Sequence, residues 1–87
     1  MAARAIDALD YTSFASTIDL YAVKDRDVER LVIVTATSGA SIVCRTKGSG
    51  DNDRTYSVSQ GDALPIQIRQ IRSVTNITRV RVEWGEF

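Results

Sequence analysis

The residues with the clearest chemical potential are four arginines toward the C-terminal end of the chain. Arg69, Arg72, Arg79 and Arg81 occur in a stretch, Ala63–Val82, that contains no acidic residue. A guanidinium group presents a fixed fork of donors that suits phosphate and carboxylate groups. Arg79 and Arg81 project from the same face of a strand, and we expect Arg69 on a paired strand beside them. This face indicates either a phosphate or nucleic-acid contact or an interface balanced by acidic residues.

The distribution of charge favours the balanced interface. The chain has 11 basic and 11 acidic residues, and a nucleic-acid binder normally has a basic excess. Residues 1–30 hold six acids against four bases. We therefore expect acids of the N-terminal segment, or of another copy, to pair with the arginines, and we consider nucleic acid an unlikely partner.

The chain has few of the residue types that commonly act in catalysis. It has no histidine and one cysteine, Cys44, which excludes the usual general base and makes a zinc site very unlikely. Cys44 lies at an apolar position of a predicted strand, so we interpret it as a small buried side chain. Asp25, Asp27 and Glu29 alternate with basic residues, which is typical of a solvated turn. We predict no enzyme activity, no catalytic residue, no metal ligand and no cofactor.

One polar loop has a loose likeness to acidic calcium-binding loops. Lys47–Asp53 reads "KGSGDND", with two glycines and three Asp or Asn residues. It lacks the full ligand spacing and the closing glutamate of an EF-hand. A solvated hairpin tip is the favoured interpretation.

The elements that must position these residues are short strands. Leu31–Thr37 is a nearly continuous β-branched run, typical of a strand buried on both faces. A turn signal at Ser38–Gly39 and the apolar run Ala40–Thr46 follow, which together predict a hairpin.

Three further strands are expected in the second half. Arg54–Ser59 and Thr78–Trp84 alternate in polarity, and Leu64–Ile68 does so until the phase slips, which indicates a bulge or a strand end near Gln70. Ser73–Asn76 is expected to be a link. We predict an all-β fold for residues 28–87, a small antiparallel β-sandwich or jelly-roll-like barrel.

Residues 1–27 are expected to form an N-terminal arm or an extra strand. Ser16–Val23 has the pattern of a strand, and the residues before it suit a short helix or an extended arm. We favour an arm that packs on a neighbouring copy, because its apolar side chains need a surface to cover them. The predicted partner-binding residues of the segment are Ile6, Leu9, Tyr11, Phe14, Ile18 and Leu20.

The single proline of the chain, Pro65, interrupts the alternation of Leu64, Ile66 and Ile68. Because proline lacks an N–H donor, it is confined to edge strands and strand starts. We predict that Pro65 has no ladder partner at its nitrogen, and that the three apolar side chains point into the core.

Residues 28–84 resemble the small spike-base or head-decoration proteins of tailed bacteriophages and phage-like gene transfer agents. The resemblance rests on a hydrophobic first strand, a glycine turn, a polar hairpin tip, a glycine-to-proline segment and a last strand ending near Trp84. It implies a β-sandwich module that oligomerises and docks on a capsid or tail, or serves as the base of a fibre or spike. The segments are Arg30–Val34, Ser38–Gly39, Lys47–Asp53, Gly61–Ile68 and Val80–Trp84.

Two functions are therefore expected. The first is a structural virion protein, made in the host cytoplasm and present as a homo-oligomer, with a trimer or a pentamer favoured. Its partners are other copies and capsid or other virion proteins, and no apolar run suits a membrane span. The alternative is a small β-barrel module that contacts nucleic acid or sugar through Arg69, Arg79 and Arg81.

Overall fold

Two long antiparallel strands form the spine of the molecule. The computed structural model describes residues 6–25, 27–64 and 67–85, and its longest elements are β3 (Arg30–Thr46) and β6 (Ile68–Gly85). Four short strands flank this pair in the order β1-β6-β3-β4, with β2 also beside β6 and β5 beside β3. All pairings are antiparallel, so the predicted all-β class is confirmed. The flanking elements are β1 (Ile6–Tyr11), β2 (Ile18–Asp19), β4 (Arg54–Ser57), β5 (Ala63–Leu64) and the helix α1 (Leu20–Lys24).

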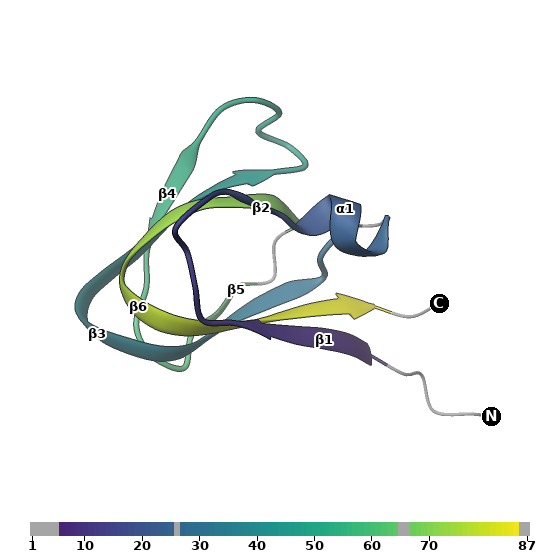
Figure 1. Ribbon diagram of the computed structural model, residues 1–87. Helices are drawn as coiled ribbons and strands as arrows, with labels where there is room; N and C mark the ends of the chain where they lie inside the picture. Colours follow the sequence, from purple (N-terminus) through teal and green to yellow (C-terminus); the bar gives the residue numbers. More distant parts are fainter. Residues whose placement is uncertain (1–5, 26, 65–66, 86–87) are drawn as a thin grey trace.

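The β3–β6 ribbon bends sharply near its middle, so its two halves fold toward each other (Figure 1). Residues 37–40 of β3 lie opposite Asn76 alone, between the register pairs Ala36–Ile77 and Ser41–Thr75. Gly39 and Asn76 both have positive φ, at 76° and 57°. The Asn76 side-chain amide donates a hydrogen bond to the carbonyl of Ser38 over 3.0 Å, which joins the two strands at the bend.

The predicted hairpin between Leu31–Thr37 and Ala40–Thr46 is wrong. Both segments belong to β3, and neither pairs with the other. The turn signal at Ser38–Gly39 does mark a change of direction, but β6 continues along the chain on both sides of it. Because each half of β3 already has β6 as its partner, the glycine bends the strand instead of reversing it.

The predicted division of the C-terminal strands is also wrong. Ser73–Asn76 is no link, because β6 runs through it, and Leu64 lies in β5 whereas Ile68 lies in β6. The phase slip near Gln70 is a bulge, one of the two alternatives. Arg45 pairs with Gln70 and Thr46 with Ile68, so Arg69 is the extra residue of β6.

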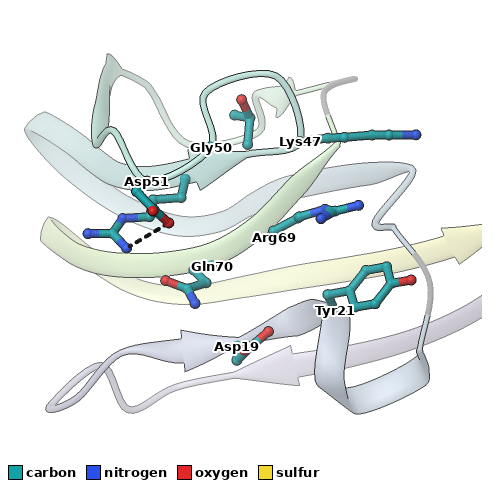
Figure 2. Close-up of a pocket in the computed structure, with 9 residues that line it drawn as sticks. Asp19, Tyr21, Lys47, Gly50, Asp51, Arg69 and Gln70 are labelled. Carbon is teal, nitrogen blue, oxygen red and sulfur yellow. Dashed lines mark ion pairs between the residues drawn. The ribbon is translucent and has the colours of Figure 1, made fainter.

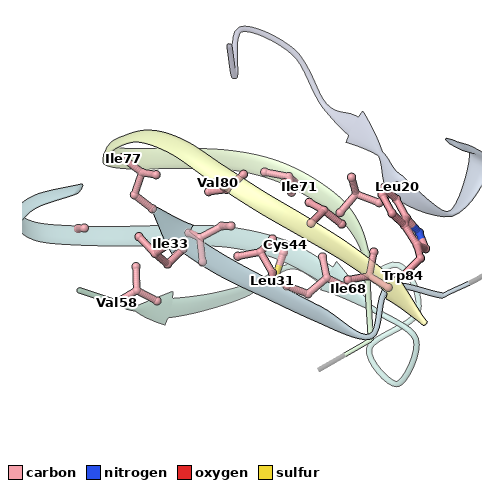
Figure 3. Close-up of a cluster of buried hydrophobic side chains, with 14 residues drawn as sticks. Leu20, Leu31, Ile33, Cys44, Val58, Ile68, Ile71, Ile77, Val80 and Trp84 are labelled. Atoms are coloured by element: carbon pink, nitrogen blue, oxygen red, sulfur yellow. The ribbon is translucent and has the colours of Figure 1, made fainter. Parts of the chain in front are cut away.

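The core lies between the two halves of the bent ribbon (Figure 3). Leu31 and Ile33 pair with Val82 and Val80 in one half, and Cys44 pairs with Ile71 in the other. Within Leu31–Thr37 only Leu31 and Ile33 are buried, Val32 and Val34 on the other face are half-buried, and Thr35 and Thr37 are exposed, so the prediction of a strand buried on both faces is wrong. The buried apolar residues are Leu20, Val28, Leu31, Ile33, Ala40, Ile42, Cys44, Val58, Ile68, Ile71, Ile77, Val80, Val82 and Trp84.

The described part of residues 1–27 packs on its own chain. All six residues of β1 pair with β6, from Ile6 opposite Gly85 to Tyr11 opposite Val80. Of the two alternatives for this segment, these residues form the extra strand. They do not form the favoured arm that leaves its own chain to pack on a neighbouring copy. The predicted strand Ser16–Val23 is strand only at Ile18–Asp19, which is β2, and the helix α1 begins at Leu20. Asp19 caps α1 by accepting a hydrogen bond from the Ala22 amide, and Asp25 ends it at φ 55°.

The structure tests the prediction for the proline segment only at the residues on either side of Pro65 and Ile66. Ile68 is fully buried and Leu64 packs against the core from β5, as expected. Pro65 and Ile66 lie outside the described residues. Among the described residues, none of the helices is long and apolar enough to cross a membrane.

Candidate functional site

A polar hollow lies on the outside of the half of the sheet that contains β2, the start of β6, the end of β3 and β4. It has a volume of about 260 Å³. Gln70 lies at its centre, because the register places Asp19 of β2 on one side of it and Arg45 of β3 on the other. The loop after β3 and the helix α1 supply the remaining walls (Figure 2). The charged, aromatic and amide side chains in its lining are Asp19, Tyr21, Arg45, Lys47, Asp51, Arg69 and Gln70.

The bulge in β6 determines where Arg69 points. As the extra residue, Arg69 leaves the regular alternation and its guanidinium lies 4.6 Å from the centre of the Tyr21 ring. Its Nε donates a hydrogen bond to Asp27 over 2.8 Å. This hydrogen bond holds the pKa of Asp27 below its usual value, and burial opposes it. Arg69 therefore ties the segment between α1 and β3 to the sheet.

The loop Lys47–Asp53 is fixed by its own polar groups. The backbone amide of Thr46 donates to the Ser49 hydroxyl over 2.9 Å, and the Ser49 amide donates to the Thr46 hydroxyl over 3.1 Å. Asp53 accepts a hydrogen bond from Arg45 over 2.9 Å, and Lys47 lies 3.6 Å from Asp27. The acids of this loop face a cation of the protein, and no group of three or more His, Cys, Asp or Glu side chains suited to a metal ion occurs within the described residues.

One of the residues that line the hollow has a buried polar atom without a hydrogen-bond partner. The side-chain oxygen of Gln70 is buried and accepts no hydrogen bond from the described residues. A buried acceptor of this kind costs free energy until a donor reaches it. The acceptor lies beneath the surface of the hollow and is closed to solvent, whereas the cations in the walls of the hollow have acidic partners.

The three arginines predicted to form one face are separated. They all lie on β6, so Arg69 is not on a neighbouring strand, and Arg79 and Arg81 belong to the other half of the bent ribbon. Arg79 pairs with Asp10 at 2.9 Å, and Arg81 lies 3.4 Å from Glu83. Arg69 and Arg79 thus have N-terminal acids as partners, which confirms the balancing that the charge distribution indicated, within one chain.

Glu83 is the most enclosed acid of this second cluster. It lies on the outer face of β6, where Arg30 donates to its Oε1 from Nε over 2.8 Å and Arg81 approaches its other oxygen. Its side chain is 12% exposed, whereas both arginines are about half exposed. The cluster covers the outer face of the sheet with paired charges.

The apolar residues predicted to bind a partner differ in their exposure. Leu20 is completely buried in the core of its own chain, so it cannot bind a partner, and that assignment is wrong. Tyr11, Phe14 and Ile18 are half-buried and pack against the same core. Leu9 remains 41% exposed on β1, and the side chain of Ile6 lies outside the described residues.

Cys44 is fully buried, as predicted. Burial raises the pKa of its thiol to about 11, and the nearby charge of Asp53 adds to the effect. A thiol that stays protonated at neutral pH is a poor nucleophile.

Comparison with known proteins gives no further assignment, since no family model, curated protein or solved structure matches the chain. The hollow was not predicted from the sequence, because the residues that line it come from segments up to about fifty residues apart. The phase slip near Gln70 was the one sequence signal in this region, and it predicted a bulge or a strand end and no hollow.

Proposed function

We propose that this protein is a structural subunit of a tailed-phage particle or a related particle, as a capsid decoration, spike base or fibre attachment. It acts by associating with further copies and docking on the particle, after synthesis in the host cytoplasm. The resemblance of residues 28–84 to such proteins motivates the proposal, and the all-β fold agrees with it. The observation that carries it is the open sheet.

The sheet ends in strands whose outer edges have no partner in the described part of the chain. β1 pairs with β6 on one side, and β4 pairs with β3 on the other. An unpaired edge is a template for a strand of another chain. β1 also exposes Leu9, one of the two large apolar side chains that are exposed in the described residues, the other being Val23 on α1.

The charges of the two edges suit head-to-tail association. β1 contains two acids and no base, and β4 contains Arg54 and no acid. Pairing of β1 in one copy with β4 in the next is a heterologous contact, which produces a closed ring when the rotation between copies allows it. This supports a small cyclic oligomer, for which we propose the trimer or pentamer expected from the sequence.

The ion pairs make the alternative of a nucleic-acid contact less favourable. A phosphate at Arg69, Arg79 or Arg81 has to compete with the acid already paired to that arginine. If the alternative were right, binding to single- or double-stranded DNA would be measurable at low salt and would fall steeply as salt rises.

A substitution at the β1 edge tests the association. Leu9→Lys places a charge where a neighbouring strand is expected, and its partial exposure lets the lysine reach water. We expect the dissociation constant of the oligomer to rise by about tenfold or more, which corresponds to about 1.4 kcal/mol. Size-exclusion chromatography with light scattering, over a series of protein concentrations, measures the change.

Val23→Lys is the matched control, because Val23 is 44% exposed but lies on α1, away from the sheet edges. It should leave the oligomer unchanged. Deleting the N-terminal residues is a poorer test, since β1 is part of the chain's own sheet. A wild-type protein that is monomeric at every concentration, or absent from purified particles by mass spectrometry, would contradict the proposed function.

A further inference from the structure

We propose that the side of the molecule that carries β1 and β2 binds, in the next copy, the side that carries β4 and β5. The inference rests on the association proposed above and adds which two surfaces meet and which side chains they bring together. Three features support it: the way the short strands flank the bent ribbon, the apolar side chains at the rim of the core, and the difference in charge between the two sides.

The short strands give the molecule two different sides. β1 and β2 pair with the end and the start of β6, whereas β4 and β5 pair with the end and the start of β3. We call these the β6 side and the β3 side. Residues 12–17 join β1 to β2 and residues 58–62 join β4 to β5, so a short link runs along each side (Figure 1). Because β3 and β6 are the two strands of one ribbon, the two sides lie at its opposite edges.

The core reaches the surface at the β6 side. Residues that lie directly opposite each other share a face of the sheet, so β1 and β2 project apolar side chains toward the core. Leu9 is 41% exposed and the others are half-buried, as is Phe14 of the link, which packs against the same core. The pairs with buried residues of β6 are Leu9 with Val82, Tyr11 with Val80 and Ile18 with Ile71.

The core also reaches the surface at the β3 side. Tyr56 of β4 lies opposite Ile42, and Leu64 of β5 lies opposite Leu31. Ile42 and Leu31 are buried, whereas Tyr56 and Leu64 pack against the core and stay half-buried. Covering one such rim with another removes apolar surface from water, which is favourable. Both rims contain aromatic side chains, the residue type that is most enriched at protein interfaces.

The charges favour a contact between unlike sides. β1 contains two acids and β2 one, without a base, whereas β4 and β5 contain Arg54 and no acid. Two β6 sides in contact would bring like charges together, which costs free energy. A β6 side against a β3 side brings Arg54 near the acids. Each copy then keeps one side free for the next copy, as a closed ring requires.

The test uses two variants that each block one side. Leu9→Lys blocks the β6 side, and Tyr56→Lys blocks the β3 side. We expect Tyr56→Lys to raise the dissociation constant of the oligomer by about tenfold or more, as Leu9→Lys does. Size-exclusion chromatography with light scattering measures the change, and Val23→Lys is again the matched control.

The two blocked variants should bind each other, because each keeps the side that the other lacks. Their mixture should contain a 1:1 complex of about 19 kDa, twice the 9.6 kDa of one chain. In ¹⁵N-labelled Leu9→Lys, the amide shifts caused by unlabelled Tyr56→Lys should fall on β4 and β5. With the labels exchanged, they should fall on β1 and β2. Unlabelled Leu9→Lys added to labelled Leu9→Lys is the control and should cause no shift.

The same spectra show whether each variant is folded. Arg54→Glu is a second β3-side variant that leaves the apolar rim intact, and its exposed position puts the fold at little risk. Because it reverses the one charge of β4, it should raise the dissociation constant of the oligomer by about threefold or more.

Three results would overturn the inference: an unchanged dissociation constant for Tyr56→Lys and Arg54→Glu, no complex in the mixture of blocked variants, or shifts on β1 and β2 in both labelled variants, which would indicate a contact between like sides. In each of these cases the wild type still associates, so the proposed function stands. A wild type that is monomeric at every concentration contradicts the proposed function itself and, with it, this contact.

Discussion

At the scale of single residues, the arginines and the cysteine both have structural roles. Arg69 and Arg79 pair with acids that link the N-terminal segment to β6. Cys44 is part of the core. The consequence for Cys44 is a measurable dependence of stability on alkaline pH.

The thiol of Cys44 should lower the stability of the protein as the pH rises from about 9 to 11. In the folded protein it keeps its proton up to about pH 11, whereas in the unfolded chain it ionises near its ordinary pKa of 9.0. The unfolded state therefore gains free energy by ionisation between these values, and below pH 9 the effect is absent. At pH 10 the loss should be about 1 kcal/mol.

Urea unfolding of the wild type and of Cys44→Ala at pH 8 and pH 10 measures this loss. The variant lacks the thiol, so it should be less sensitive to the change in pH, whatever its stability at pH 8. Equal sensitivity of the two proteins would contradict the assignment of a buried, protonated thiol.

At the scale of elements, the bend in the β3–β6 ribbon decides the architecture. Without it, the two strands would form an extended twisted ribbon with no enclosed core. The bend depends on Gly39 and Asn76, which face each other with positive φ, and on the hydrogen bond from Asn76 to Ser38. The four short strands then extend each half.

Gly39→Ala should destabilise the protein by about 1–2 kcal/mol, the usual cost of a left-handed conformation for a residue with a Cβ atom. Steric clash is not the reason, because an added Cβ would lie 3.7 Å from the Asn76 side chain, an ordinary contact. Gly48→Ala is the control, since that glycine has no positive φ and no atom within 4 Å of an added Cβ. Chemical denaturation should show a change of less than about 0.5 kcal/mol for the control.

At the scale of the whole molecule, stability is concentrated in the centre of the sheet. β6 has neighbours on both sides at Gln70–Ile71 and at Val80–Glu83, whereas β1 and β4 are edges. Ile6, near the start of the chain, pairs with Gly85, near its end, so the sheet is complete only when the two ends of the chain come together.

Hydrogen exchange should therefore separate the centre of the sheet from its edges. Amides of β6 that lie between two neighbours should exchange only through global unfolding, and those of β4 should exchange faster by about tenfold or more. Protection of β1 should be higher in the oligomer than in the Leu9→Lys variant, while β6 stays the same in both. Uniform protection across all strands would argue against a sheet with open edges.

The sequence by itself was sufficient for the class of fold and for several local features. Alternating polarity indicated strands, and the phase slip after Ile68 indicated either a bulge or a strand end, of which the bulge at Arg69 is the one present. The excess of acids in residues 1–30 also indicated that they would pair with the arginines. These features depend on neighbouring residues or on a sum of charges, so they can be predicted without knowing which segments contact each other in the fold.

Tertiary structure alone decided how the strands are joined. A glycine turn signal has the same sequence whether a strand reverses or bends, and the presence of β6 along both halves of β3 selects the bend. The same pairing places Asp19, Arg45 and Gln70 side by side and separates Arg69 from Arg79 and Arg81. Long-range pairing of strands has no local signature, and for that reason the polar hollow is visible only in the folded molecule.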